Sequence, residues 1–270
     1  MASFIRPPAV AGRFYPNNPE RLLQEVRGYT EAAGEKLSAI GCVVPHAGYM
    51  YSGHVAGAVY ARLELPKTFI ILCPNHTGMG EPLAIMSEGA WMTPLGKVRV
   101  ASALAHALLE SFPQLSEDAV AHSAEHALEV QLPFLQALAG DFSFVPITVG
   151  LGQVEALEAL GDAMARVISA QKERPLIVSS SDMNHYESDA VTRVKDRKAI
   201  QQILELDARG LFEVVKRENI SMCGYAPTVA MLTAARRLGA KRAEVIKYGT
   251  SGDISGDRDL VVGYAGIAIC

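Results

Sequence analysis

Short apolar runs alternate with longer amphipathic segments along this chain, in the order typical of an α/β protein. The apolar runs predict buried strands because they are short, partly β-branched and bounded by turn residues. The longer segments predict helices because their apolar positions recur at helical spacing. The predicted strands are 39–44, 68–72, 142–149, 176–179, 245–248 and 260–269, and the predicted helices are 53–62, 101–111, 128–139, 154–171, 191–206 and 225–238.

The order of these segments predicts how the strands run. Strand 39–44, helix 53–62 and strand 68–72 follow one another as a βαβ unit, which predicts a parallel pair of strands. The chain contains neither an internal repeat nor a low-complexity linker. We therefore expect residues 1–270 to form a single α/β domain with a central, mainly parallel or mixed β-sheet flanked by helices.

Two prolines interrupt predicted elements. Pro146 lies within strand 142–149, and Pro133 lies within helix 128–139. Proline has no N–H to donate, so we expect this strand near a sheet edge or a bulge, and this helix bent or interrupted.

The composition is that of an ordinary globular protein. The 270 residues are 49% hydrophobic and 20% charged, which excludes disordered, fibrous and disulfide-scaffold classes. A chain of this length buries about three quarters of the surface that it exposes when extended, so its core is large enough to fold without a metal or disulfide. The net charge is -4 at pH 7. With no basic surplus, nucleic acid is not an expected partner.

The ends and the cysteines predict the compartment. The N-terminus lacks the basic start and apolar core of a signal peptide, and no run reaches the roughly 18 apolar residues of a membrane span. The four cysteines are too few and too scattered for a disulfide framework. We therefore expect a cytoplasmic protein that has no membrane contact and keeps its thiols reduced. These cysteines are Cys42, Cys73, Cys223 and Cys270.

Three histidines follow predicted strands at equivalent places. His46 follows strand 39–44, His76 follows 68–72, and His185 follows 176–179. Ligands of open α/β sheets bind outside the carboxyl ends of the strands. Imidazole is the commonest protein metal ligand and acid–base group, so these residues indicate a metal site, an acid–base site or both.

Asp182 lies three residues before His185. Its carboxylate can orient an imidazole, bind a metal itself, or form a turn or helix cap after the strand. Cys223 lies directly before a predicted helix. A thiol there is expected to have a lowered pKa and to be available as a ligand or nucleophile. The turn at 248–253 can bind an anion through backbone N–H groups or serve as an ordinary loop.

A second polar cluster contains His122, Glu125, His126 and Glu129. In a helix, the two glutamates would share one face and the two histidines another, because each pair is four residues apart. Ser123 could instead cap this helix and give Glu125 a plain capping role. Glu129, one turn inside an apolar helix, is the better candidate to point into a polar site.

Together these motifs resemble the Memo protein family, whose prokaryotic members are called AmmeMemoRadiSam system protein B. The resemblance implies a fold similar to that of class III extradiol dioxygenases, which are non-haem iron enzymes. The motifs occur in the family's order over nearly the whole chain. They are Ala-Gly-Arg-Phe-Tyr-Pro (11–16), Pro-His-Ala-Gly-Tyr (45–49), Pro-Asn-His (74–76), Glu-His-Ala-Leu-Glu (125–129), Ser-Ser-Asp-Met-Asn-His (180–185), Met-Cys-Gly (222–224) and Tyr-Gly-Thr-Ser-Gly-Asp (248–253).

The resemblance implies a metal site on His46, His76 and Cys223. The cysteine stands where the dioxygenases place a glutamate ligand. Two histidines and a carboxylate are typical of Fe(II) oxygenases, whereas a thiolate shifts the preference toward copper(I) or zinc. We expect a divalent or redox metal, with iron first and copper or zinc as alternatives.

The resemblance also implies catalytic roles and partners. His185 matches the acid–base histidine of the dioxygenases, Asp182 lies beside it, and His126 matches another pocket histidine. One hypothesis is therefore a metal-dependent oxidoreductase. The other is a non-catalytic module that holds a small molecule or peptide in the same cleft. The family name implies partnership with an Ammecr-type domain and a radical-SAM protein.

Overall fold

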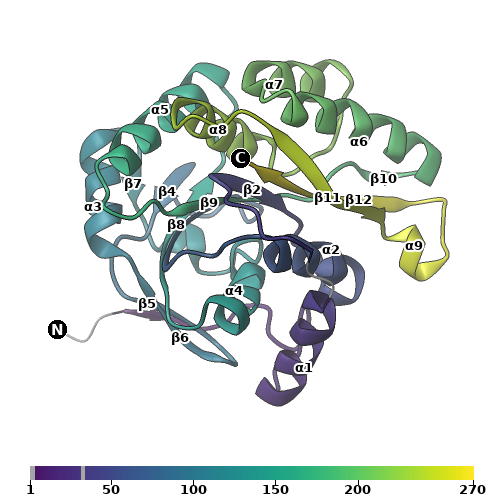
Figure 1. Ribbon diagram of the computed structural model, residues 1–270, viewed down its shortest axis with the longest axis horizontal. Coiled ribbons are helices and arrows are strands. Elements are labelled where there is room, and N and C mark those ends of the chain that lie inside the picture. Colours follow the sequence, from purple (N-terminus) through teal and green to yellow (C-terminus); the bar gives the residue numbers. More distant parts are fainter. Residues whose placement is uncertain (1–3, 32–33) are drawn as a thin grey trace.

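The computed structural model describes residues 4–31 and 34–270, and its centre is one mixed β-sheet with helices on both faces (Figure 1). The strands are β1 (Ile5–Arg6), β2 (Gly41–Val44), β3 (Thr68–Pro74), β4 (Leu83–Ile85), β5 (Ala90–Thr93), β6 (Gly96–Val100), β7 (Ser116–Glu117), β8 (Ser143–Val149), β9 (Leu176–Ser180), β10 (His185–Glu187), β11 (Ala243–Thr250) and β12 (Val261–Ile269).

The strand order is β1-β5-β6-β8-β3-β9-β2-β12-β10, with β11 paired to β12, and β4 paired to β7 and β8. The central strands β8, β3, β9 and β2 run parallel, whereas β12 is antiparallel to β2. Strands β3, β9 and β2 are buried almost throughout, which explains their continuous apolar sequences. This arrangement confirms the predicted α/β fold with a mixed central sheet.

The helices form two layers around this sheet (Figure 1). On one face α8 packs on β2, β3 and β9, and α5 and α7 pack on α8. On the other face α2 packs on β2, β11 and β12, and α1 and α4 pack on α2. The helices are α1 (Pro19–Thr30), α2 (Tyr49–Arg62), α3 (Ser102–Ser111), α4 (Leu132–Ala139), α5 (Val154–Ser169), α6 (Asp189–Leu204), α7 (Ala208–Arg217), α8 (Tyr225–Arg237) and α9 (Gly252–Ser255).

The two strands of the predicted βαβ unit are parallel, as expected, but they are not neighbours in the sheet. Strands β2 and β3 run parallel on either side of β9, which pairs with both. Pro146 was predicted to lie near a sheet edge or a bulge, but its strand, β8, lies inside the sheet between β6 and β3. The residue pairs with Ile71 of β3, while on the other side of β8 the partner changes from β6, which ends opposite Phe144, to the antiparallel β4, whose last residue lies opposite Ile147. The proline occupies the gap between those two partners, where no ladder hydrogen bond is lost.

The predicted helix 128–139 is interrupted, as its proline suggests. Glu129–Gln131 forms a 3₁₀ turn, and α4 begins only at Leu132 with Pro133 in its first turn. The sequence patterns did not predict α1, α7, α9 or the short strands β1, β4 to β7 and β10. Within residues 4–31 and 34–270, the helices are too short or too polar to cross a membrane.

The topology brings the predicted site together. His46, His76 and Asp182 all follow the carboxyl ends of β2, β3 and β9, which are neighbours in the sheet. Parallel strands deliver the loops after their carboxyl ends to one edge.

Candidate metal centre

His46 is the most deeply buried imidazole of the centre. It follows β2 through Pro45, and its backbone N–H donates to Asp182 Oδ1 at 2.7 Å. Its Nδ1 lies 3.0 Å from Ser180 Oγ, and its Nε2 lies 3.2 Å from Cys223 Sγ. Burial, together with His76 and His126 nearby, holds the pKa of His46 well below its usual value. The ring is therefore neutral at pH 7, the form that binds metals.

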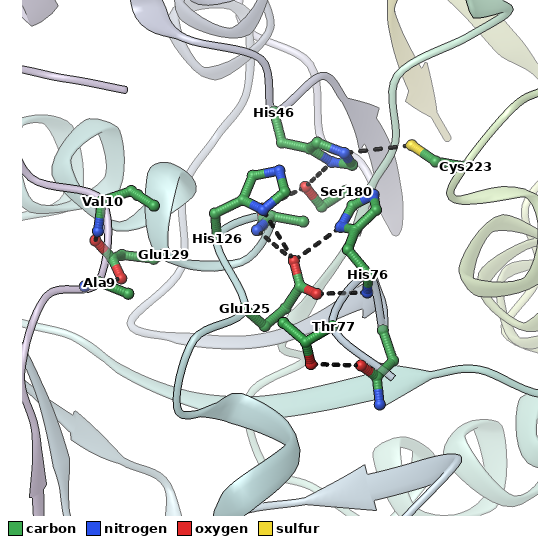
Figure 2. A network of polar contacts seen from close by, with 12 residues as sticks. Ala9, Val10, His46, His76, Thr77, Glu125, His126, Glu129, Ser180 and Cys223 are labelled. Atoms are coloured by element: carbon green, nitrogen blue, oxygen red, sulfur yellow. Dashed lines mark hydrogen bonds and ion pairs between the residues drawn. The ribbon is translucent and has the colours of Figure 1, made fainter. Parts of the chain in front are cut away.

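His76 is held by Glu125 at two points. Its backbone N–H donates to Glu125 Oε2 at 2.6 Å, and its Nδ1 lies 2.9 Å from Oε1 (Figure 2). Burial of Glu125 disfavours its charge, but the bonds from His76 and from the Ala127 N–H outweigh burial and hold its pKa at about 2. The carboxylate can only accept at pH 7, so Nδ1 of His76 carries the proton. Its Nε2 is then a free donor atom for a metal.

Glu125 itself comes from a loop and not from a helix, the arrangement considered for this cluster. Its Oε1 accepts the N–H of Ala127, two residues later, and the chain between the 3₁₀ turns Val120–His122 and Glu129–Gln131 is not helical. Such a local side-chain bond competes with helical hydrogen bonding. Ser123 is not the N-cap considered for it; it ends the 3₁₀ turn Val120–His122, and its hydroxyl donates to the carbonyl of Val120. The expected shared helical faces of this cluster are therefore wrong.

His126 completes a group of three imidazoles. Its ring stacks on His76 with centroids 4.7 Å apart and meets His46 edge-on at 5.5 Å. The ring also packs against Phe14, with centroids 4.7 Å apart, and Nδ1 lies 3.4 Å from Glu125 Oε1. Burial lowers the pKa of His126 despite the opposing charge of Glu125. A neutral ring therefore stands beside both candidate ligand histidines.

Cys223 reaches the centre from the loop before α8. A side chain at Gly224 would collide with the Ser180 carbonyl and with Ser181, so glycine lets this loop lie against β9. The Gly224 N–H donates to Ser181 Oγ. The expected lowering of the thiol pKa is wrong. Burial, reinforced by the charge of Asp182, raises the pKa of Cys223, and the nearby hydrogen bonds offset this only in part.

Asp182 contacts His46 through both oxygens of its carboxyl group. Its Oδ1 accepts the His46 N–H, and its Oδ2 lies 4.0 Å from His46 Nε2. Burial raises the pKa of Asp182. Asp182, which follows β9, therefore holds the main chain of His46, which follows β2, in place.

His185 lies at the start of β10, next to a bulge in which Tyr186 has a φ of 59°. Its backbone N–H donates to Ser221 Oγ at 2.7 Å, and its Nδ1 donates to the Ser221 carbonyl at 2.9 Å. Asn184 accepts from both the N–H and the hydroxyl of Ser221. Since a carbonyl cannot donate, Nε2 of the neutral His185 ring carries the lone pair. Sequence patterns gave no signal for Ser221.

Ligand atoms of His46, His76 and Cys223 lie within 4.8 Å of one another. A second group of this kind contains His76, Glu125 and His126. In that group Glu125 already accepts hydrogen bonds from two backbone N–H groups and from His76, so it orients His76 instead of offering a free ligand.

Comparisons with known proteins show the family to which this chain belongs. The family model described as Memo-like protein matches residues 6–268. The chain belongs to the Memo family. A MEMO1 family protein of Methanosarcina mazei is 44% identical over 267 residues, covering 98% of this chain and 99% of its own length. A MEMO1 family protein of Methanopyrus kandleri is 42% identical over 276 residues, covering 97% and 98%.

A solved structure supports the fold of this Memo chain. The crystal structure of an uncharacterized protein from Escherichia coli K12 matches with a TM-score of 0.57 at 13% identity, covering 84% of this chain and 98% of that one. At this identity the likeness concerns the fold alone.

Glu129 of the Memo motif does not point into the centre, contrary to expectation. It is fully buried and pairs with Arg6 Nη1 at 2.6 Å. It also accepts from the N–H groups of Ala9 and Val10 and from the hydroxyl of Tyr15. Figure 2 shows this contact with the N-terminal segment on the far side from Cys223. Glu129 therefore fixes the N-terminal motif against the domain.

Two other predicted polar features lie outside the centre. His122 is buried against Trp91, with ring centroids 5.7 Å apart, and burial together with the Arg6 charge lowers its pKa to about 3. In the turn at 248–253, the Thr250 N–H donates to Asp253 Oδ2 and the Ser251 N–H donates to Val262. Those N–H groups are already bonded, which favours an ordinary loop over an anion site.

Proposed function

We propose that this Memo-family protein is a metal-dependent oxidoreductase whose single metal is held by His46 Nε2, His76 Nε2 and Cys223 Sγ. The observation that carries the proposal is the convergence of these three donors from the loops after β2 and β3 and before α8. Their side chains are preassembled, so a metal needs to displace only the thiol proton.

The donor set fits a transition metal better than magnesium or calcium, which prefer oxygen ligands. Iron is our first assignment because the family resembles non-haem iron enzymes, and copper and zinc are the alternatives because thiolate is a soft ligand. A redox metal at this position would supply electron exchange with oxygen or a substrate.

The surrounding residues are suited to handling protons. Nε2 of His185 is a free acceptor in the neutral ring, because the Ser221 carbonyl occupies Nδ1. Burial raises the pKa of Asp182, the bond from the His46 N–H opposes the rise, and a positive charge on His185 or His126 would oppose it further, so these groups share one electrostatic environment. We propose His185 as the residue that accepts or returns a proton, with Asp182 and His126 as supporting catalytic groups.

The test is anaerobic purification, metal analysis and oxygen consumption with a panel of catechols. We expect about one metal per chain and metal-dependent oxygen uptake with at least one ring substrate. A bound metal without uptake would favour the alternative function, a cleft that holds a small molecule or peptide without turnover. Absence of tight metal binding would overturn the metal centre itself.

The compartment is part of the same proposal. The cysteines Cys42, Cys73, Cys223 and Cys270 are all free thiols. A thiol that must remain reduced to bind a metal fits a cytoplasmic setting.

A further inference from the structure

We infer that Ser180, supported by Gln131, fixes the tautomer of His46 so that its Nε2 lone pair faces the metal position before any metal binds. This inference rests on the proposed metal centre and assigns positioning roles to two residues that make no contact with the metal.

Ser180, the last residue of β9, places its hydroxyl among three polar partners. This hydroxyl lies 2.6 Å from the Ala127 carbonyl, 2.8 Å from Gln131 Nε2 and 3.0 Å from His46 Nδ1. Ser180 is fully buried, so no bulk water competes for these contacts. The hydroxyl has one proton and two lone pairs to divide among three partners.

The orientation of Gln131 follows from its other contacts. One amide atom lies 3.0 Å from the Pro45 carbonyl, which can only accept, so that atom is the NH₂ group. The opposite amide atom accepts from the hydroxyl of Tyr60 at 2.9 Å. The same NH₂ group therefore donates its second proton to Ser180 and occupies one of the two lone pairs.

The remaining proton and lone pair of Ser180 then have only one consistent assignment. The Ala127 carbonyl cannot donate, so the hydroxyl proton must go to it. The second lone pair faces His46 Nδ1. If Nδ1 were unprotonated, two lone pairs would meet at 3.0 Å in a buried site, at the cost of an unsatisfied polar group. Nδ1 therefore carries the proton, and Nε2 faces Cys223.

The hydrogen-bond chain that orients His46 through Ser180 differs chemically from the one that holds His76. His76 donates to an ionised carboxylate, which raises its strength as a ligand, whereas His46 donates to a neutral hydroxyl. The two histidines are thus oriented by different side chains, although both hydrogen-bond networks reach Ala127, whose carbonyl accepts from Ser180 and whose N–H donates to Glu125. A loss of the Ser180 chain should affect His46 and leave the His76 tautomer unchanged.

The test reads the tautomer directly by long-range ¹H–¹⁵N NMR of the metal-free protein labelled with ¹⁵N-histidine. We expect His46 to be protonated at Nδ1 in the wild type and to shift toward protonation at Nε2 in Ser180→Ala. Ser179→Ala is the matched control, because Ser179 is an equally buried neighbour in β9 that bonds to Thr228 instead. Protonation of His46 at Nε2 in the wild type would overturn the inference, whatever the metal does.

Cobalt(II) titration gives the second readout through the thiolate charge-transfer band. Loss of a group that orients a ligand histidine typically costs about 10–100-fold in metal affinity. We expect a loss in this range for Ser180→Ala, a smaller loss for Gln131→Met, and none for Ser179→Ala. Equal affinity in Ser180→Ala and Ser179→Ala would contradict the positioning role.

The two readouts separate the two proposals. If the wild type binds no cobalt but shows the expected tautomer, the metal centre fails and the Ser180 chain stands. Should Ser180→Ala fail to fold, Gln131→Met and the wild-type tautomer still decide the question.

Discussion

Nδ1 of His76 donates to Oε1 of Glu125 at 2.9 Å, and the backbone N–H of the same histidine donates to the other carboxylate oxygen at 2.6 Å. This double contact joins the loop after β3 to a non-helical segment 49 residues further along the chain. It fixes both the position and the tautomer of a proposed ligand, so Glu125 is the carboxylate on which the centre depends most directly.

We therefore predict that Glu125→Gln weakens cobalt(II) binding by about 10–100-fold. Glutamine keeps the size of the side chain but removes the charge that holds the proton on Nδ1 of His76. The measurement is a cobalt titration followed at the thiolate band. Glu117→Gln is the control, because Glu117 accepts from the Ser87 N–H, away from the centre. Unchanged affinity in Glu125→Gln would mean that His76 needs no anionic partner.

The proposed ligands themselves should be dispensable for folding. We predict that His46→Ala and Cys223→Ser lose tight cobalt binding yet remain folded without metal. The hydrophobic core is continuous across the sheet and does not depend on the centre. Cys270→Ser is the control for replacing a partly buried thiol elsewhere. Full metal occupancy in either ligand variant would show that the ligands are misassigned.

The position of the centre could be predicted because it depends on features that short stretches of sequence reveal. Buried parallel strands can be recognised from short apolar runs, and the residues after their carboxyl ends must meet at one edge. His46 and His76 could be placed in this way. The partners that orient them could not, because Ser180, Gln131 and Glu125 reach across 49 to 134 residues of chain.

The sequence pattern favoured Glu129 over Glu125 as the glutamate that points into the site, and this prediction was wrong. Helical spacing favoured Glu129, but the helix begins only at Leu132, and the carboxylate of Glu125 takes the Ala127 N–H that a helix would have used. Arg6, the partner of Glu129, lies 123 residues away in a two-residue strand. No periodicity in the sequence could reveal that pair.

The corrected role of Glu129 makes its own prediction. Breaking a buried ion pair by removing one charge typically costs about 3–5 kcal/mol, and both Arg6 and Glu129 are buried. We expect Glu129→Gln to lower the free energy of unfolding by roughly that amount while leaving cobalt affinity unchanged well below the unfolding temperature. Denaturant unfolding measures the first quantity, and Glu88→Gln on the exposed surface is the control. The opposite pattern, normal stability with weak metal binding, would restore Glu129 to the site.

Asp196 predicts a pH dependence of stability that is separate from the metal. Its Oδ1 accepts the Asn184 N–H, and its Oδ2 accepts the hydroxyl of Tyr248. Burial raises the pKa of Asp196 to about 6, although these hydrogen bonds and the Arg193 charge oppose the rise. In the unfolded chain an aspartate has a pKa of about 3.9.

The sign follows from proton counting. Between about pH 4 and pH 6 the folded state holds a proton on Asp196 that the unfolded state has lost, so stability falls as pH rises through this window. The contribution is complete below about pH 4 and is lost above about pH 6, and two pKa units correspond to about 3 kcal/mol. We expect Asp196→Asn to remove this fall, because asparagine does not titrate. Denaturant unfolding at a series of pH values gives the difference between wild type and variant, with the exposed Asp141→Asn as control. Parallel pH profiles for wild type and Asp196→Asn would contradict the raised pKa.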